Sequence, residues 1–160
     1  MNDQKNIKLD SKDKKILEIL DQNARMSIAK ISKKTGIQRD SIMYRLKRME
    51  SSRIIAFYHA RVDPVQIGYP VYSFVNFTLY NLDKEEEHKF LSYLKTTKNV
   101  TYIAKTTGKW DFTLSIAAKN LKHFDEIITQ IRYKFSKIIK EYEVASIVEE
   151  YKFDSVYELV

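Results

Sequence analysis

The sequence predicts an α+β protein of two domains. They are an N-terminal helix-turn-helix domain, winged-helix-like in its order of elements, and a C-terminal ferredoxin-like βαββαβ domain with an antiparallel sheet. Three observations predict this arrangement. Apolar residues recur at helical spacing as far as Glu50, both prolines fall within residues 63–70, and strand-like and helical patterns alternate after them. We therefore expect the first domain at residues 1–62, a linker at 63–70 and the second domain at 71–160.

The first domain is expected to contain three helices. Asp10 is suited to be the N-cap of a helix that runs to about Asn23, because its carboxylate can accept amide hydrogens of the first turn. Ser27 fits the same role for a second helix, and Gly36 can take the left-handed conformation that a tight turn requires. The stretch from Ser27 to Glu50 is therefore typical of a helix-turn-helix.

The segment after the third helix has a strand-like pattern. Residues 54–58 are rich in β-branched and aromatic side chains, and the extended pattern continues to Val62. We expect this segment to leave the domain as a wing or an arm.

The third helix separates an apolar side from a polar side. Ile42, Leu46 and Met49 recur at helical spacing and are expected to face the core. In helix-turn-helix proteins the opposite side lies in the DNA major groove, with base edges near its first residues and phosphates near its cations. The residues expected to contact DNA are Gln38, Arg39, Asp40, Ser41, Met43, Tyr44, Arg45, Lys47 and Arg48. The alternative is a solvated, charged helix of an ordinary bundle.

The distribution of charge favours DNA over that alternative. Residues 1–61 carry 15 Lys and Arg against 7 Asp and Glu, whereas residues 62–160 carry 13 against 14, so the two parts have net charges of +8 and −1. This asymmetry indicates a polyanionic partner. Double-stranded DNA fits better than an anionic membrane surface, because the basic helices are short and lack a broad apolar face.

The composition gives no support for catalysis or metal binding. The chain has no cysteine, and His59, His88 and His123 stand far apart. It contains no phosphate loop, dinucleotide-binding fingerprint or nucleophile elbow. No apolar run reaches membrane-spanning length, and no charged-then-apolar leader begins the chain. We expect no catalytic residue, no cofactor, no metal, no membrane partner and a cytoplasmic location.

The second domain is expected to hold six elements in the order strand, helix, strand, strand, helix, strand. We place them at residues 71–80, 83–95, 100–106, 110–117, 121–135 and 140–153. In the first strand one face can meet the helices, but Tyr72, Phe74 and Tyr80 occupy the other. Large apolar patches are rarely left in water, so we expect the sheets of two subunits to pack together.

Several motifs together are similar to those of a known family. They are LDSKDKKILEIL at Leu9–Leu20, NARMSIAKISKKTGI at Asn23–Ile37, YRLKRMESSRIIAFYHARVDPVQIG at Tyr44–Gly68 and TGKWDF at Thr107–Phe112. In order and spacing they resemble the Lrp/AsnC family of transcription regulators over nearly the whole chain. The resemblance implies a dimer, often assembled into tetramers or octamers, whose C-terminal domain binds an amino acid or similar effector between subunits.

Two positions depart from the pattern that the resemblance implies. The family usually has serine where Gln38 stands, and usually glycine where Arg53 stands. Gln38 is a poorer helix cap, and Arg53 is strained if the position requires a left-handed backbone.

The resemblance also implies an effector site in the turn that carries Thr107, Gly108, Trp110 and Asp111. Gly108 allows close approach of the backbone to a ligand, the exposed amides can receive a carboxylate, and Asp111 can pair with an α-ammonium group. The alternative is a plain β-hairpin in which Gly108 permits the turn and Asp111 caps it.

The expected function is that of a sequence-specific DNA-binding transcription regulator of the Lrp/AsnC type, modulated by an amino acid or related effector. We expect a homodimer or a higher even-numbered homo-oligomer on an inverted-repeat site. One alternative is an architectural protein that binds DNA with little sequence choice. Another is a tetrapyrrole decarboxylase of similar architecture, which the basic third helix disfavours.

Overall fold

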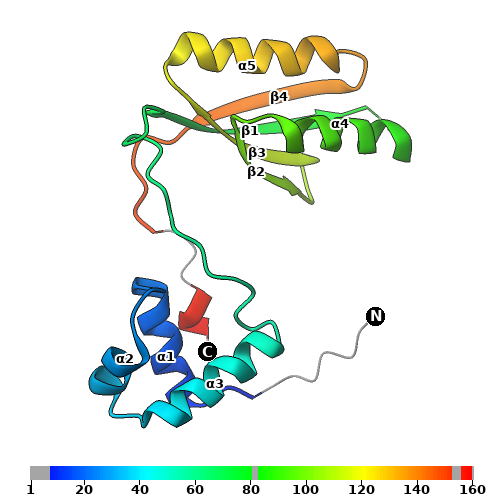
Figure 1. The fold of residues 1–160 in the computed structure, drawn as a ribbon. Helices are drawn as coiled ribbons and strands as arrows, with labels where there is room; N and C mark the ends of the chain where they lie inside the picture. The colour runs from blue at the N-terminus through cyan, green and yellow to red at the C-terminus, as the bar shows by residue number, and fades with distance from the viewer. Residues whose placement is uncertain (1–7, 81–82, 153–155, 160) are drawn as a thin grey trace. The chain divides into compact units, whose positions relative to one another are not determined.

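The computed structural model describes residues 8–80, 83–152 and 156–159 (Figure 1). Its elements occur in the order three helices, then strand, helix, strand, strand, helix and strand, and finally one short 3-10 helix. This order confirms the predicted fold class, α+β with a helix-turn-helix followed by a βαββαβ arrangement.

Contacts divide the chain into two units. The first contains the described residues up to Arg61 together with those from Tyr151 onwards, and the second is Val62–Glu150. The prediction assigned the whole of 71–160 to the second domain. The described residues after Glu150 instead belong to the first unit, where the 3-10 helix η1 (Val156–Leu159) contacts the first helix of the chain.

The helices of the first unit begin and end where local capping chemistry predicts. They are α1 (Ser11–Gln22), α2 (Ile28–Thr35) and α3 (Arg39–Ser51). Asp10 and Asp13 form a capping box at α1, Ser27 caps α2 through the Lys30 amide, and Gly36 ends α2 with a left-handed φ of 72°. The turn between α2 and α3 is thereby closed, as a helix-turn-helix requires.

The two ends of α3 have weaker caps. Gln38 takes the N-cap position but makes no side-chain hydrogen bond there. After the helix, Arg53 adopts a φ of 59°, the one positive value among the non-glycine residues that the structure describes. A left-handed backbone at a residue with a Cβ is strained, so both expectations about these positions are confirmed.

The core of the first unit joins all three helices. Its fully or nearly buried residues are Ile16, Ile31, Ile37, Ile42 and Met49. Leu46 packs partly buried against them, so the predicted inner side of α3 is confirmed.

The segment after α3 pairs with no other strand. Residues 54–70, all of which the structure describes, contain no β-strand, so no β wing forms. Its start is held to α3 by the Tyr58 hydroxyl, which donates to a carboxylate oxygen of Glu50 over 2.8 Å. Burial and this carboxylate raise the pKa of Tyr58 to about 12. A turn at Pro64–Gly68 then precedes the sheet.

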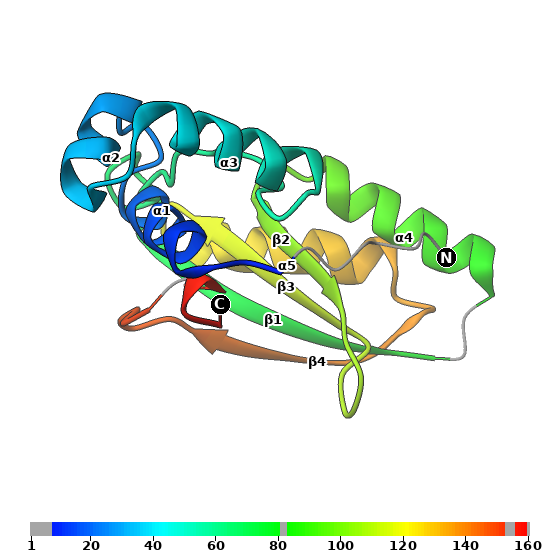
Figure 2. The same ribbon diagram turned by 90° about the horizontal axis from the view of Figure 1, so that it is seen from below.

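The second unit is a four-stranded antiparallel sheet with two helices. Its elements are β1 (Val71–Leu79), α4 (Lys84–Thr96), β2 (Val100–Lys105), β3 (Phe112–Ala118), α5 (Leu121–Lys134) and β4 (Ile139–Ser146). The strand order β2-β3-β1-β4 is that of the ferredoxin-like arrangement, and α4 and α5 lie on the same side of the sheet (Figure 2). The end of the last strand differs from prediction. This strand ends at Ser146 rather than near Phe153, which lies outside the described residues, and Leu121, the first residue of α5, is exposed.

The core of the second unit lies between the helices and one face of the sheet. It is formed by Val75, Phe77, Phe90, Leu94, Phe112, Leu114, Ile116, Ala118, Ile127, Ile128, Ile131 and Ile138. Phe90 of α4 meets Phe77, Phe112 and Phe135 in edge-to-face contacts with ring centroids 5.1–6.0 Å apart. Such contacts add to the stabilisation from apolar burial and fix the position of α4 on the sheet.

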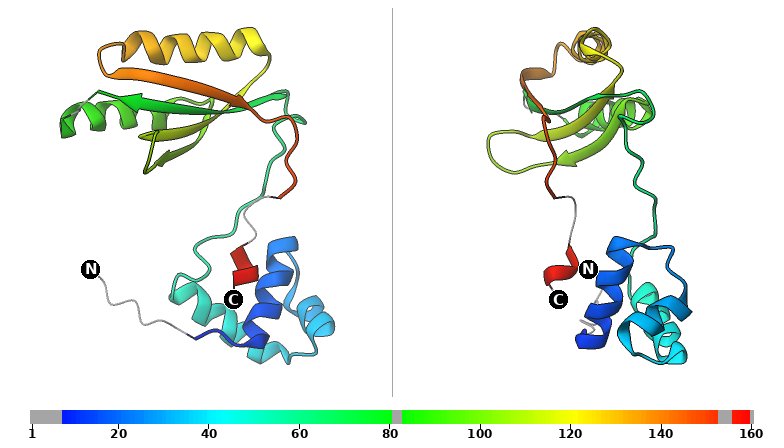
Figure 3. Two further views of the ribbon diagram at one scale, coloured as in Figure 1. Left: turned by 180° about the vertical axis from the view of Figure 1, so that it is seen from behind. Right: turned by 90° about the vertical axis from the view of Figure 1, so that its left-hand side faces the viewer.

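The opposite face of the sheet carries aromatic side chains and is covered by neither α4 nor α5 (Figure 3). Pairing aligns Tyr102, Ser115, Phe74 and Ala145 in one row across all four strands. Phe74 keeps 39% of its surface exposed and Tyr102 keeps 52%, while Ser115 between them is buried. We call this row, together with Tyr72, the open face.

Candidate nucleic-acid interface

The outer side of α3 exposes most of the residues expected to contact DNA. The exposed ones are Gln38, Arg39, Asp40, Met43, Tyr44 and Lys47. Ser41 is half-buried, and Tyr44 leaves 69% of its surface in solvent. A large aromatic side chain so exposed, on a helix whose other side packs in the core, indicates a contact surface rather than a packing residue.

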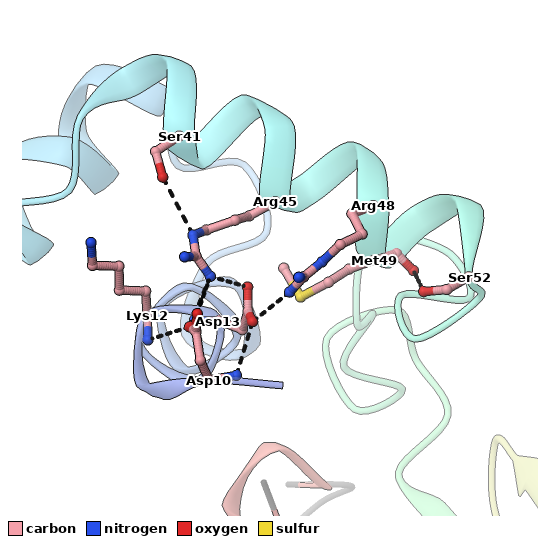
Figure 4. A network of polar contacts seen from close by, with 8 residues as sticks. All are labelled: Asp10, Lys12, Asp13, Ser41, Arg45, Arg48, Met49 and Ser52. Carbon is pink, nitrogen blue, oxygen red and sulfur yellow. Dashed lines mark hydrogen bonds and ion pairs between the residues drawn. The ribbon is translucent and has the colours of Figure 1, made fainter. Parts of the chain in front are cut away.

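Arg45 and Arg48 lie elsewhere: both turn towards α1 (Figure 4). One Nη of Arg45 lies 2.8 Å from carboxylate oxygens of Asp10 and of Asp13, and one Nη of Arg48 lies 2.5 Å from the second oxygen of Asp13. Asp13 is fully buried. Both arginines were expected to contact DNA, but in the structure their guanidinium groups pair with carboxylates of α1.

Asp10 and Arg45 stabilise each other's charged forms. The Asp13 amide and the Arg45 guanidinium lower the pKa of the Asp10 carboxyl to about 2. Hydrogen bonds to Asp13 and Asp10 raise the pKa of Arg45 above its ordinary value. Two aspartates and two arginines cancel in charge, so the cations left on the outer side of α3 are Arg39 and Lys47.

Asp13 is the residue of this site that sequence reasoning missed. It precedes Ile16, Leu17 and Leu20 at the spacing of their own apolar stripe, so its carboxylate is directed into the core. A carboxylate in a buried stripe requires a cationic or hydrogen-bonding partner, and this rule would have pointed to an arginine on a neighbouring helix.

Further exposed cations lie on α2. Lys30, Lys33 and Lys34 are all exposed, whereas Ile31 of the same helix is buried. In helix-turn-helix proteins the first helix of the motif crosses the DNA backbone, so these lysines are placed to approach phosphates. None of the three belongs to the set of DNA contacts expected from the sequence.

Asp111, in the turn between β2 and β3, makes hydrogen bonds that hold the turn to β1. The Asp111 carboxylate accepts the Leu79 amide hydrogen over 2.7 Å, and the Asp111 amide donates to the Phe77 carbonyl over 2.9 Å. These bonds fasten the turn to the end of β1. Thr107 and Gly108 are exposed at the tip, where Gly108 has a φ of 105°.

The other aromatic residue of this turn is partly shielded. Trp110 is half-buried, and the ammonium group of Lys109 lies 4.2 Å from the centre of its ring. This cation–π contact occupies the ring on one side.

Neither a metal site nor a membrane span is present in the part of the chain that the structure describes. No group of three or more acidic or histidine side chains is placed to hold a metal ion. No described helix is long and apolar enough to cross a membrane.

Comparison with known families identifies both units. Residues 9–50 match the AsnC-type helix-turn-helix domain, and residues 73–156 match the Lrp/AsnC ligand binding domain. A DNA-binding motif joined to a ligand-binding domain defines the class: the chain is a DNA-binding transcription regulator and not an enzyme. It belongs to the Lrp/AsnC family, as the resemblance predicted.

Individual relatives agree with this assignment. The HTH-type transcriptional regulator LrpC of Bacillus subtilis is 31% identical over 124 residues, which cover 78% of this chain and 84% of LrpC. The solved structure of LrpC superimposes with a TM-score of 0.79 at 29% identity, covering 91% of this chain and 99% of that one. The L-Met complex of the transcriptional regulator NMB0573 from Neisseria meningitidis has a TM-score of 0.84 at 19% identity, covering 96% and 100%, and shows the shared fold.

Proposed function

We propose that the chain binds an inverted-repeat DNA site as a homodimer or a higher even-numbered homo-oligomer, with α3 of each copy in a major groove. The observation that carries this proposal is the outer side of α3, where Tyr44 and Met43 are exposed beside Arg39 and Lys47. Met43 and Tyr44 offer apolar contacts to thymine methyl groups. Arg39 can donate to the acceptor edge of guanine, and Lys47 can neutralise a phosphate.

The remaining polar residues at the start of α3 complete the proposed base-reading set. Gln38 can bond adenine, Asp40 can accept from cytosine, and Ser41 can bond either donors or acceptors. All three lie in or before the first turn of α3, which is the part of a recognition helix that meets base edges.

The proposed dimer forms through the open face. Phe74 and Tyr102 expose apolar surface in one aligned row, and the small residues Ser115 and Ala145 beside Phe74 leave room for side chains of a second copy. A two-fold axis through this face presents two recognition helices to one duplex. The half-sites are then spaced by about one helical turn or a multiple of it.

The effector proposed for the second unit is an amino acid. NMB0573, which shares the fold, was solved as a complex with L-Met. The exposed tip of the β2–β3 turn, Thr107 and Gly108, can offer backbone amides to a carboxylate, and the half-buried Trp110 follows two residues later in the chain. Asp111 is proposed to shape this tip by holding it to Leu79. An effector shared by two copies changes DNA binding only if its affinity differs between assembly states.

Selection of bound fragments from a random DNA pool, with and without each amino acid, tests the proposal. We expect an inverted repeat that is enriched by the unsubstituted chain and lost with Tyr44→Ala and Arg39→Ala. An architectural protein would instead enrich no common sequence. Calorimetry that detects no heat with any of the twenty amino acids, together with unchanged selection, would remove the effector part while leaving the DNA-binding part in place.

A further inference from the structure

We infer that Arg45 and Arg48 are positioning residues, which set where α3 lies on α1 through buried Asp13, and that they do not contact phosphates. This inference rests on the proposed function, because it concerns how the same helix is presented to DNA. Under this inference, other cations of α3, chiefly Lys47, neutralise the DNA phosphates.

The first support is the geometry of the Asp13 carboxylate. One of its oxygens accepts from Arg45 over 2.8 Å, and the other accepts from Arg48 over 2.5 Å and from the Asp10 amide over 3.0 Å. A single buried group thus joins the first turn of α1 to two successive turns of α3 (Figure 4). Bidentate and charge-assisted bonds restrict orientation as well as distance, so they limit both sliding and rotation of α3.

The second support is that the N-cap and the exit of α3 are weak. Gln38 supplies no capping bond, and the chain leaves the helix through the strained backbone of Arg53. Besides the buried apolar residues Ile42 and Met49, the polar contacts of Arg45 and Arg48 join α3 to α1. The Nε of Arg45 also donates to Ser41 over 3.3 Å on the same helix, which orients its guanidinium group.

The third support is that the two guanidinium groups are withdrawn from solvent. The Arg45 side chain is 16% exposed and the Arg48 side chain 29%. The Nε of Arg48 is fully buried and, among the described residues, has no hydrogen-bond partner. To reach a phosphate, either arginine would give up its ion pair with buried Asp13 and leave one carboxylate oxygen without its cationic partner, which costs more than a screened surface contact returns.

These facts predict that loss of a phosphate contact and displacement of α3 affect DNA binding differently: the first changes its salt dependence, and the second changes its affinity alone. Each lost phosphate contact flattens the slope of log K against log salt concentration by about 0.9, whatever the DNA sequence. Displacement of α3 instead weakens base contacts, so it lowers affinity for the selected site and leaves the slope unchanged. The loss expected is roughly 5- to 150-fold, the range for one good base contact.

The test compares Arg48→Gln with Lys47→Gln, a matched loss of one charge on the adjacent, exposed residue. Affinity is measured for the selected site and for an unrelated duplex of equal length over a series of salt concentrations. We expect Lys47→Gln to flatten the slope on both duplexes. Arg48→Gln should weaken only the selected site, with the slope unchanged. A slope flattened by Arg48→Gln as much as by Lys47→Gln overturns the inference.

A double-mutant cycle adds a second criterion. If Arg48 acts through Asp13, then Arg48→Gln has little further effect on affinity for the selected site in an Asp13→Asn background. Additive effects overturn the inference. Circular dichroism and thermal denaturation establish that each variant is folded at the assay temperature. If Arg48→Gln does not fold, Arg45→Gln is measured in its place, because it leaves Arg48 on Asp13.

The controls separate this inference from the proposed function. If Lys47→Gln and Tyr44→Ala change neither affinity nor specificity, α3 is not the DNA-contacting helix and both proposals fail. If those two variants act as expected and the arginine variants also flatten the slope, the proposed function stands and the positioning role fails.

Discussion

The open face of the sheet allows the proposed dimer to be tested with one substitution. Phe74 lies opposite Ser115 on β3 and Ala145 on β4, so its ring stands above two small neighbours, and 39% of its surface is exposed in the single chain. Fully burying a phenylalanine contributes about 1.5–3 kcal/mol, so covering the exposed share contributes roughly 0.6–1.2 kcal/mol per copy. A two-fold interface contains the ring twice.

We therefore expect Phe74→Ala to weaken the dimer by about 1.2–2.4 kcal/mol, a roughly 7- to 60-fold higher dissociation constant. Sedimentation equilibrium over a dilution series measures it. Tyr133→Ala is the control, because Tyr133 is also an exposed aromatic residue, at 87%, but lies on α5 in the helical layer. Equal dissociation constants for Phe74→Ala and the unsubstituted chain, with unchanged circular dichroism, would refute the argument that a second copy covers this face.

Three further predictions concern single residues. Asp111→Ala removes the acceptor of the Leu79 amide. It should lower the free energy of unfolding in urea by about 1–3 kcal/mol and abolish the effector's influence on DNA binding. Asp111→Asn keeps an acceptor for the Leu79 amide and should lose less stability. Equal denaturation midpoints for the two variants and the unsubstituted chain would contradict this. Asp10 has its pKa lowered to about 2, so its stabilising contribution is complete above its ordinary pKa near 3.8 and is lost as pH falls towards 2. The melting temperature of Asp10→Asn should therefore lie below that of the unsubstituted chain at pH 7, and the two should converge near pH 2. A difference in melting temperature that stays constant with pH would refute this linkage. Arg53→Gly should raise stability by about 0.5–1 kcal/mol by relieving a φ of 59°, and Arg53→Ala, which keeps a Cβ, should not; equal melting temperatures for the two variants would exclude strain as the cause.

The caps show what local sequence can predict. Ser27 and Gly36 act through backbone groups within four residues of themselves, so their roles follow from residue type and spacing alone. The defects at Gln38 and Arg53 were expected from the comparison with the family pattern, and both are present in the structure. The inner side of α3 was predictable for a similar reason, since helical periodicity determines which residues share a face.

The segment after α3 shows where local propensity stops being informative. Residues 54–58 have strand-forming side chains, yet they form no strand, because a strand needs a neighbouring backbone to pair with. The end of β4 is similar: it stops at Ser146, which faces Ser73 in β1, just short of where β1 itself begins at Val71.

The sequence by itself determined the elements, their order and hence the family, because periodicity, capping and turn chemistry are local and the matching motifs extend over most of the chain. Only the tertiary structure decided how Arg45, Arg48 and Asp111 are used. Arg45 and Arg48 lie 32 and 35 residues from their partner Asp13 in the sequence, and Asp111 lies 32 residues from its partner Leu79. No pattern within one helix or one turn contains both members of such a pair. The charge of a helix follows from its sequence. Whether a charged side chain faces DNA or a buried carboxylate depends on which element packs beside it, and that is set by the fold.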